Sequence, residues 1–460
     1  VVRAIGGAAG AVSFLFRDRE GMMWAGTAPG LMRIAPDGSS SVLPREGDED
    51  LAAAEDREGD LWLGTASSGL AVLRDRKFFT LTAQDGLTQE YVLALAQAPN
   101  GYVGVGTNGG GLNVFRQGKF QALTTAQGLS SNVVLTVAAA ANGDVWVGTP
   151  DGLDFVQNGE VTDSFTTADG LADDFIRSLH IGPHGALWIG TSHGLSRYAN
   201  DTVTTWTTLD GLGSDLIGAM ANDRDDSLWI GTLGGLTRFR DGKFRNFTTK
   251  DGLSSNVITS LYADSAGTLW IGTNDAGLDR MANGHIVALQ SDELPRRVLG
   301  ILEDGSGYLW LSSNTGVYRV SRSGLDRLAA GGPAPEVMRF GVTDGMRISE
   351  CSSGGHPASV RLRDGELWFA TLKGIAVVNP EQMPLNRIPP PVEIERVSVD
   401  DVPQASTDAL RVAPSHSHYE FDYAGLSFVA PQKVEYRYQL VGFDRGWVDA
   451  GMRRAAYYTN

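Results

Sequence analysis

A short phrase recurs along the chain and constrains its fold more than any other feature: glycine, any residue, an apolar residue, Trp, an apolar residue, Gly and Thr. Counting three degenerate copies, its Trp positions or their equivalents are 24, 62, 104, 146, 188, 229, 270, 310 and 368. Successive copies lie 38 to 42 residues apart, except for a gap of 58 before the last. A fixed period of this length is the signature of a repeat architecture.

The unit around Trp270 shows what each copy builds. Residues 257–264 alternate between apolar and polar side chains, as a half-buried strand does, and 268–273 form a second strand that carries the Trp. A third strand at 277–281, the turn Asn283-Gly284 and a fourth strand at 286–289 complete the unit. Four antiparallel strands in about 40 residues predict the blade of a β-propeller, whereas an array of sandwiches needs about 100 residues per unit. The predicted fold class is therefore all-β.

A second phrase, Asp-Gly-Leu or a close variant, connects one unit to the next. It occurs at 85–87, 127–129, 169–171, 210–212, 251–253 and 344–346. With the words Leu-Trp-Ile-Gly-Thr at 269–273 and Asp-Gly-Leu-Ser-Ser-Asn at 251–256, the sequence resembles the two-component regulator propellers. The resemblance extends over nearly the whole chain and implies a β-propeller of four-stranded blades.

The C-terminal part has a different pattern. The last repeat ends near Pro380, and residues 381–391 form a Pro-rich linker that includes Pro389-Pro390-Pro391. Residues 392–460 carry Tyr436-Arg437-Tyr438 and Trp447 and resemble the Y_Y_Y domain, an immunoglobulin-like sandwich that follows such propellers. Because the sequence ends before a sandwich would close, we expect the N-terminal part of this domain and a chain that is a fragment of a longer protein.

Counting the repeats gives a domain division. Seven copies counted back from Trp368 reach the copy at Gly104, so residues 89–380 are predicted to form a seven-bladed propeller with about 42 residues per blade. Residues 1–88 then form two blades, the tail of an upstream propeller. One ring of eight or nine blades is the rival interpretation. Since the first blade has Gly104 in place of Trp, we expect either loose packing there or a neighbouring aromatic residue, such as Tyr102, in the space.

Charge and cysteine content exclude several partners. Acidic residues outnumber basic ones 54 to 38, and the net charge of −16 disfavours binding to nucleic acid or to anionic membrane surfaces. A single cysteine, Cys351, cannot form an intrachain disulfide or a thiolate metal site alone. No apolar run is long enough to cross a membrane, so membrane attachment is expected only through a segment outside this sequence.

Two apparent catalytic motifs are explained by the repeat. Residues 104–109 match the dinucleotide fingerprint and residues 190–194 match the nucleophile elbow. Both motifs need a helix after the strand, whereas a further strand of the repeat follows here. We therefore predict no catalytic residue, no cofactor and no metal site in this chain.

Candidate ligand-binding residues precede the innermost strand of each repeat, where a propeller brings them to one rim of its channel. They are Glu90, Asn132, Asp174, Asp215, Asn256 and Arg297. The alternative interpretation is that they only cap strand ends. A mixed set of amides, acids and one arginine suits a neutral polyhydroxyl ligand better than a polyanion.

The resemblance implies a sensor function. Such proteins are periplasmic regions of inner-membrane proteins, in which the propeller binds a small molecule or oligosaccharide. The sandwich, as a homodimer, passes the signal to a cytoplasmic histidine kinase or diguanylate cyclase. This fragment itself is expected not to be an enzyme. Two alternatives remain: a propeller enzyme acting on polysaccharide, such as a lyase or glycosidase, and a propeller that docks another protein.

Overall fold

The computed structural model describes residues 11–28, 30–44, 48–383, 388–404, 411–412, 418–428, 431 and 434–459. The chain divides into two compact units: one comprises Val1–Asp75 and Pro384–Asn460, the other Arg76–Met383. No helix in the described part of the chain is long and apolar enough to cross a membrane.

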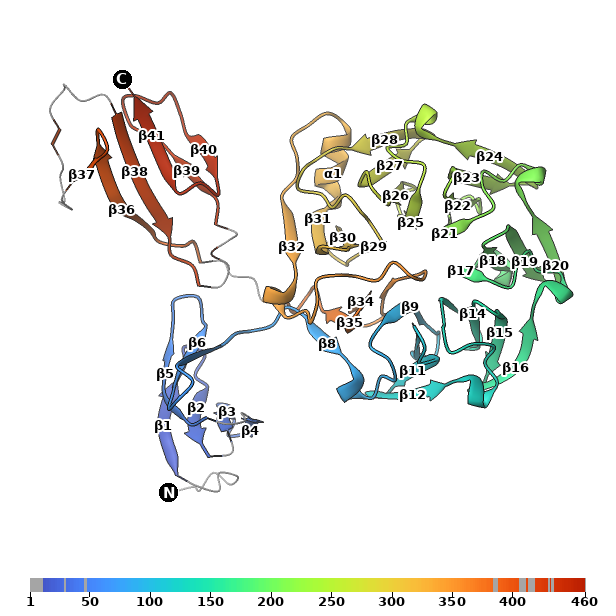
Figure 1. Ribbon diagram of the computed structural model, residues 1–460, viewed down its shortest axis with the longest axis horizontal. Helices are drawn as coiled ribbons and strands as arrows, with labels where there is room; N and C mark the ends of the chain where they lie inside the picture. Colours follow the sequence, from blue (N-terminus) through green and yellow to red (C-terminus); the bar gives the residue numbers. More distant parts are fainter. Residues whose placement is uncertain are drawn as a thin grey trace. The chain divides into compact units, whose positions relative to one another are not determined.

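The larger unit, whose residues are all described, consists of seven four-stranded antiparallel sheets. Six follow the chain from the inner to the outer strand, and Figure 1 shows them arranged around a common centre. Their strands are β9 (Val92–Gln97), β10 (Val103–Thr107), β11 (Leu112–Arg116) and β12 (Lys119–Leu123) in the first blade; β13 (Thr136–Ala139), β14 (Val145–Thr149), β15 (Gly152–Gln157) and β16 (Glu160–Phe165) in the second; β17 (Ile176–Ile181), β18 (Leu187–Thr191), β19 (Leu195–Ala199) and β20 (Thr202–Trp206) in the third.

The next three blades continue the series. Their strands are β21 (Ile217–Asn222), β22 (Leu228–Thr232), β23 (Gly235–Arg240) and β24 (Lys243–Phe247) in the fourth; β25 (Ile258–Ala263), β26 (Leu269–Thr273), β27 (Leu278–Ala282) and β28 (His285–Leu289) in the fifth; β29 (Gly300–Glu303), β30 (Tyr308–Ser313), β31 (Gly316–Ser321) and β32 (Val337–Phe340) in the sixth. The seventh comprises β33 (Ser359–Arg361), β34 (Leu367–Thr371), β35 (Gly374–Val378) and, from the start of the unit, β8 (Phe79–Leu81).

The inner strands form a closed circle. Contacts run from β9 through β13, β17, β21, β25 and β29 to β33, and β33 contacts β9 again. The expected all-β propeller fold is confirmed.

Strand β8 closes this ring and corrects one predicted boundary. We assigned residues 1–88 to upstream blades, but β8 pairs with β35 of the seventh blade, and the propeller unit begins at Arg76. Phe78, just before β8, is fully buried against Trp310, Phe340 and Phe369. The repeat phase places this segment at the end of the blade that contains Trp62. This ring closes with an outer strand from the other end of the unit, and a pairing between such distant segments cannot be seen in a local pattern.

The Asp-Gly-Leu connectors form single 3-10 turns, and the first five share a common set of contacts, while the sixth has Gly341 in place of the threonine N-cap. In the connector at 248–253, the Thr248 hydroxyl accepts from the Lys250 amide while the Asp251 carboxylate accepts from the Thr248 amide. Gly252 has φ +106°, a left-handed conformation that favours glycine, and Leu253 is buried. The phrase therefore ends one outer strand and anchors the chain before the next inner strand.

The repeated Trp residues are tied to the turns that precede them. Trp270 is fully buried, and its indole N–H donates to Asp264 Oδ2 at 3.0 Å, while Asp264 Oδ1 accepts from the Thr268 amide at 2.9 Å. The same indole-to-carboxylate bond joins Trp24 to Asp18, Trp62 to Asp56, Trp229 to Asp223 and Trp310 to Asp304. One acidic residue thus satisfies both a tight turn and a buried ring.

The first blade compensates for its missing Trp in a way we did not predict. A Cβ on Gly104 would lie 3.0 Å from Val137 Cγ1, so an aliphatic side chain of the next blade occupies the space. The ring of Tyr102 instead lies beneath the Arg116 guanidinium, 4.4 Å from ring centroid to Cζ. That Tyr102 occupies part of this space stays a prediction.

Two insertions account for the long gap before Trp368. Helix α1 (Arg322–Ala329) lies between β31 and β32, and Leu325 on it is fully buried. A long loop between Met346 and β33 is the second insertion.

The smaller unit also consists of sheets. Strands β1 (Val12–Arg17), β2 (Met23–Thr27), β3 (Gly30–Ile34) and β4 (Ser40–Pro44) form one, and β5 (Asp50–Glu55), β6 (Leu61–Thr65) and β7 (Leu70–Leu73) another. In the C-terminal part, β37 (Val402–Pro403), β36 (Val392–Val399), β38 (His418–Gly425) and β41 (Ala455–Thr459) form a sheet, and β39 (Tyr436–Tyr438) pairs with β40 (Val448–Gly451). Residues 384–387 of the predicted linker 381–391 lie outside the described residues.

Candidate functional site

The second insertion reaches into the centre of the ring (Figure 1). We call residues Cys351–Ala358 the channel loop. The Leu95 amide of the first blade donates to the carbonyl oxygen of Pro357 at 2.9 Å, and Thr136 Oγ1 of the second donates to the carbonyl oxygen of His356 at 2.5 Å. Ser178 of the third blade forms a parallel β-bridge with His356. The channel loop therefore joins its own seventh blade to the inner strands of the first three.

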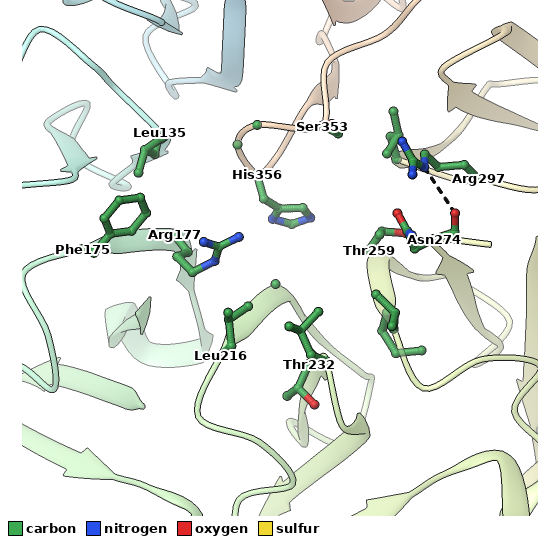
Figure 2. Close-up of a pocket in the computed structure, with 17 residues that line it drawn as sticks. Leu135, Phe175, Arg177, Leu216, Thr232, Thr259, Asn274, Arg297, Ser353 and His356 are labelled. Atoms are coloured by element: carbon green, nitrogen blue, oxygen red, sulfur yellow. Dashed lines mark hydrogen bonds between the residues drawn. The ribbon is translucent and has the colours of Figure 1, made fainter. Parts of the chain in front are cut away.

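A cavity of about 360 Å³ lies beside the channel loop, and Figure 2 shows the side chains around it. This volume falls at the lower end of the range for small-molecule sites. We call this space the channel cavity. Its lining comprises Leu135, Phe175, Arg177, Leu216, Gly218, Thr232, Leu233, Val257, Ile258, Thr259, Asn274, Arg297, Leu299 and the channel-loop residues Ser353, Gly354, Gly355 and His356.

One repeat position supplies much of this lining. It is the second residue of the inner strand or its equivalent, and in the first six blades it is occupied by Leu93, Leu135, Arg177, Gly218, Thr259 and Leu299. The spacing of these residues matches that of the Trp positions. Five of the six line the channel cavity, and a Cβ on Gly354 of the channel loop would lie 2.6 Å from Leu93 Cδ2. The small residues Gly218 and Thr259 leave room on one side of the channel.

The charged groups in this lining are positive. Arg177 and Arg297 lie on either side of His356 in Figure 2, and no Asp or Glu is among the described residues that line the cavity. Arg177 Nε is buried without a hydrogen-bond partner, and burial lowers the pKa of this guanidinium from its ordinary value. An arginine nevertheless stays protonated in proteins. Arg297 Nε donates to the carbonyl oxygen of Asn274 at 3.2 Å.

His356 is held neutral. Burial, assisted by the nearby His180, lowers the pKa of His356 to about 4. Its Nδ1 has no hydrogen-bond partner among the described residues. Near neutral pH the imidazole can therefore present a donor or an acceptor to a molecule in the cavity.

The buried Cys351 at the start of the channel loop is not activated. Burial raises the pKa of its thiol to about 12, so the thiol is protonated and a poor nucleophile.

Five of the six predicted rim residues contact the connectors. The side chains of Asn132, Asp174, Asp215 and Asn256 each accept a hydrogen bond of 2.7–2.9 Å from a backbone N–H seven residues earlier. Glu90 accepts from the Ala83 amide at 3.4 Å and pairs with Arg347 at 2.8 Å. These contacts tie the start of each inner strand to the connector turn before it, which is a structural role of the kind that the alternative interpretation proposed, and ligand binding by these five residues stays a prediction.

Arg297 alone among the six lines the channel cavity. For Asn132, Asp174, Asp215 and Asn256, the residue three positions later in the sequence lines the cavity, and for the last three of them so does the residue that follows directly. Comparing the repeats position by position through the inner strand would have singled out Arg177, the one charged residue in that series. The channel loop lies outside the repeat and carries no such signal.

Comparison with known proteins agrees with the fold. A model of the two component regulator propeller family matches residues 252–275, from the fifth connector through β26. No curated protein matches this sequence. Among solved structures, the extracellular domain assigned to the hybrid two component system BT3049 of B. thetaiotaomicron is 21% identical with a TM-score of 0.76. The alignment covers 97% of this chain and 63% of that one, so the chain spans less than two thirds of its length.

Two further structures resemble the chain less closely. A streptogramin B lyase is 15% identical with a TM-score of 0.51, over 66% of this chain and 97% of the lyase. PorZ, a surface component of the type-IX secretion system of Porphyromonas gingivalis, is 13% identical with a TM-score of 0.50, over 91% of this chain and 69% of PorZ. At these identities the likeness establishes the fold alone, so any function has to be argued from the residues of the site.

Proposed function

We propose that this chain is the ligand-binding sensor region of an extracytoplasmic signalling protein and that the channel cavity holds the ligand. The observation that carries the proposal is the channel loop, which borders the cavity and bonds to three blades other than its own. The likeness to an extracellular domain of a hybrid two component system supports a sensor role.

The position of the channel loop in the chain suggests how binding is transmitted. The loop leads directly into β33 of the seventh blade, whose last strand in sequence is β35. After β35 the chain continues toward the C-terminal sheet that begins at Val392. A ligand that contacts both the channel loop and the inner strands of other blades stabilises one arrangement of the loop. The seventh blade, from which the chain leaves the propeller, is then the one whose conformation changes when the ligand binds.

The remaining parts of the proposal follow from the family resemblance. The chain lies in the periplasm as part of an inner-membrane protein, and residues 392–460 belong to a Y_Y_Y domain that forms a homodimer. A histidine kinase or diguanylate cyclase outside this sequence provides the output, and residues preceding β8 belong to an upstream propeller. The fragment binds its ligand without transforming it.

The proposal is tested by a thermal-shift screen of the chain with a library of small metabolites and oligosaccharides. Hydrogen–deuterium exchange of the chain, measured with and without the compound that stabilises it most, should show protection of the channel loop and of residues 257–259.

A variant tests whether the compound occupies the cavity. Leu233, which lines the cavity and is 50% exposed, is replaced by Trp to narrow the cavity, and Leu209→Trp, at a 96% exposed connector position, is the control. Weaker binding in Leu233→Trp alone supports the proposal. A hit that protects neither the channel loop nor residues 257–259 contradicts it.

A further inference from the structure

Arg177 is the feature of the channel that the propeller fold does not explain. It has no hydrogen bond or ion pair to any residue in the described part of the chain, and its guanidinium lies over the ring of Phe175, 5.8 Å from Cζ to centroid. Leaving a charged group partly desolvated and unpaired opposes folding. Its presence therefore calls for a partner that the chain itself does not supply.

Two other arginines in the same ring show the usual arrangement. Arg319, which is buried, lies 3.2 Å from the Asp304 carboxylate, and Arg280 lies 2.8 Å from Asp326. Both are on strands at repeat positions remote from the channel lining. The chain is rich in acidic residues, with 54 in total, and yet no described acidic residue lines the channel cavity. The cavity around Arg177 therefore lacks a carboxylate, although the chain as a whole has an excess of acidic residues.

We infer that the channel cavity binds a small organic anion, whose carboxylate or phosphate group pairs with the Arg177 guanidinium. This inference rests on the proposed function and names the ligand class for the same site. A guanidinium presents a planar fork of donors that matches both oxyanions, often through two parallel hydrogen bonds. The anion provides the charge that the protein lacks.

The rest of the lining selects for an organic molecule. Leu135, Phe175 and Leu216 surround Arg177 in Figure 2 and offer an apolar surface to a carbon skeleton. On the other side of His356, Arg297 and the Asn274 amide supply polar contacts for a second substituent. The neutral His356 ring can donate or accept a hydrogen bond between them. This lining differs from the mixed set of rim residues, which favoured a neutral polyhydroxyl ligand.

The test uses anions paired with neutral amides of the same shape. The thermal midpoint of the chain is measured in Tris-chloride at constant ionic strength with benzoate, succinate or inorganic phosphate, and with benzamide and succinamide as the neutral counterparts. We expect at least one organic acid to raise the midpoint while its amide does not. A response to inorganic phosphate as large as that to the best organic acid would show that the apolar lining is not used, and would overturn the organic part of the inference.

Two variants locate the effect. Arg177→Met removes the charge with a similar volume, and Arg224→Met removes an exposed arginine in the β21–β22 turn as a matched control. Without ligand, Arg177→Met is expected to melt at or above the wild-type midpoint, because the substitution removes a partly desolvated charge and breaks no hydrogen bond or ion pair. Its affinity for the anion should fall about ten- to a hundredfold in calorimetric titration, whereas Arg224→Met should bind as the wild type does. Arg177→Lys, which keeps the charge without the fork, should bind with intermediate affinity.

The following results would contradict the inference that the cavity binds an anion. If Arg177→Met melts several degrees below the wild type in the absence of ligand, the residue has a structural role and needs no anion. If none of the three anions shifts the midpoint, or if Arg177→Met and Arg177→Lys respond as the wild type does, the anion site is excluded. Binding of a neutral molecule that protects the channel loop would leave the proposed sensor function intact, while protection confined to other surfaces would refute both.

Discussion

The hydroxyl of Thr136 donates a 2.5 Å hydrogen bond to the carbonyl oxygen of His356, 220 positions later in the sequence. The same hydroxyl oxygen accepts from the Leu179 amide of the third blade at 3.0 Å. One side chain thus connects the inner strands of the second and third blades to the channel loop. Because His356 borders the channel cavity, this bond fixes one wall of the proposed ligand site.

Replacing Thr136 by Val should loosen the channel loop while leaving the ring folded. The variant keeps the shape of the side chain but loses both hydrogen bonds, which should cost about 1–3 kcal/mol of unfolding free energy. Hydrogen–deuterium exchange should become faster in residues 351–358. Thr204→Val, at an exposed position of β20, is the control and should change neither quantity. Unaltered exchange in the loop of Thr136→Val would show that other contacts hold it.

Closure of the ring by β8 predicts very different effects at two adjacent phenylalanines. Phe78 is fully buried among Trp310, Phe340 and Phe369, whereas the next residue, Phe79, is 45% exposed. Phe78→Ala should lower the unfolding free energy by about 3–5 kcal/mol, and Phe79→Ala by about 1 kcal/mol or less. Urea denaturation measures both. Equal, small losses would mean that the segment before β8 does not contribute to the seventh blade.

The sequence could predict the features that the repeat encodes and not those that depart from it. Four-stranded blades, the turn at each Asp-Gly-Leu connector and the burial of Leu253 all follow from local patterns that recur. The origin of β8 could not be predicted in this way, since its sequence fits the blade before it equally well. Only the closure of the whole ring decides its partner.

The candidate site shows the same limit. Asn132 and its equivalents were chosen because polar residues at strand starts face a channel rim, and the structure gives them backbone partners in the connectors. The cavity is lined by residues one and three positions later, and a period-two strand pattern does not say which face of the strand meets the channel. The channel loop occurs once in the chain, so no comparison between repeats could place it.

Inserting the missing Trp into the first blade should destabilise it. In Gly104→Trp the new side chain would collide with Val137, whose Cγ1 lies 3.0 Å from the position of a Cβ on residue 104. Overpacking of this kind typically costs about 1–3 kcal/mol, which calorimetric melting can measure. Gln121→Trp, on an exposed position of the same blade, controls for adding an indole group. A higher melting temperature for Gly104→Trp would instead reveal an unfilled space.

The lowered pKa of His356 predicts a pH dependence of stability with a definite sign. Burial and the nearby His180 lower this pKa from 6.5 to about 4 in the folded chain. Between these values the unfolded chain binds a proton that the folded chain does not, so the unfolding free energy falls as the pH falls from about 6.5 to 4. Each pKa unit corresponds to about 1.4 kcal/mol, and the half-buried site should yield a loss of about 1–3 kcal/mol.

This pH effect is isolated by comparing variants. His356→Gln should lose part of the dependence on pH in denaturation experiments between pH 4 and 6.5. The exposed His285, replaced by Gln, serves as the control and should retain the wild-type profile. Parallel profiles for the wild type and His356→Gln would contradict a lowered pKa of His356 in the folded chain.

The central claim, that the channel cavity is the ligand site, is tested most directly by a crystal structure of the chain with the organic acid that raises its melting temperature most. The account predicts that the acidic group lies against the Arg177 guanidinium, beside His356, with the carbon skeleton on Phe175 and Leu216. An acid bound elsewhere on the molecule, with the space beside Arg177 occupied by solvent alone, would contradict it.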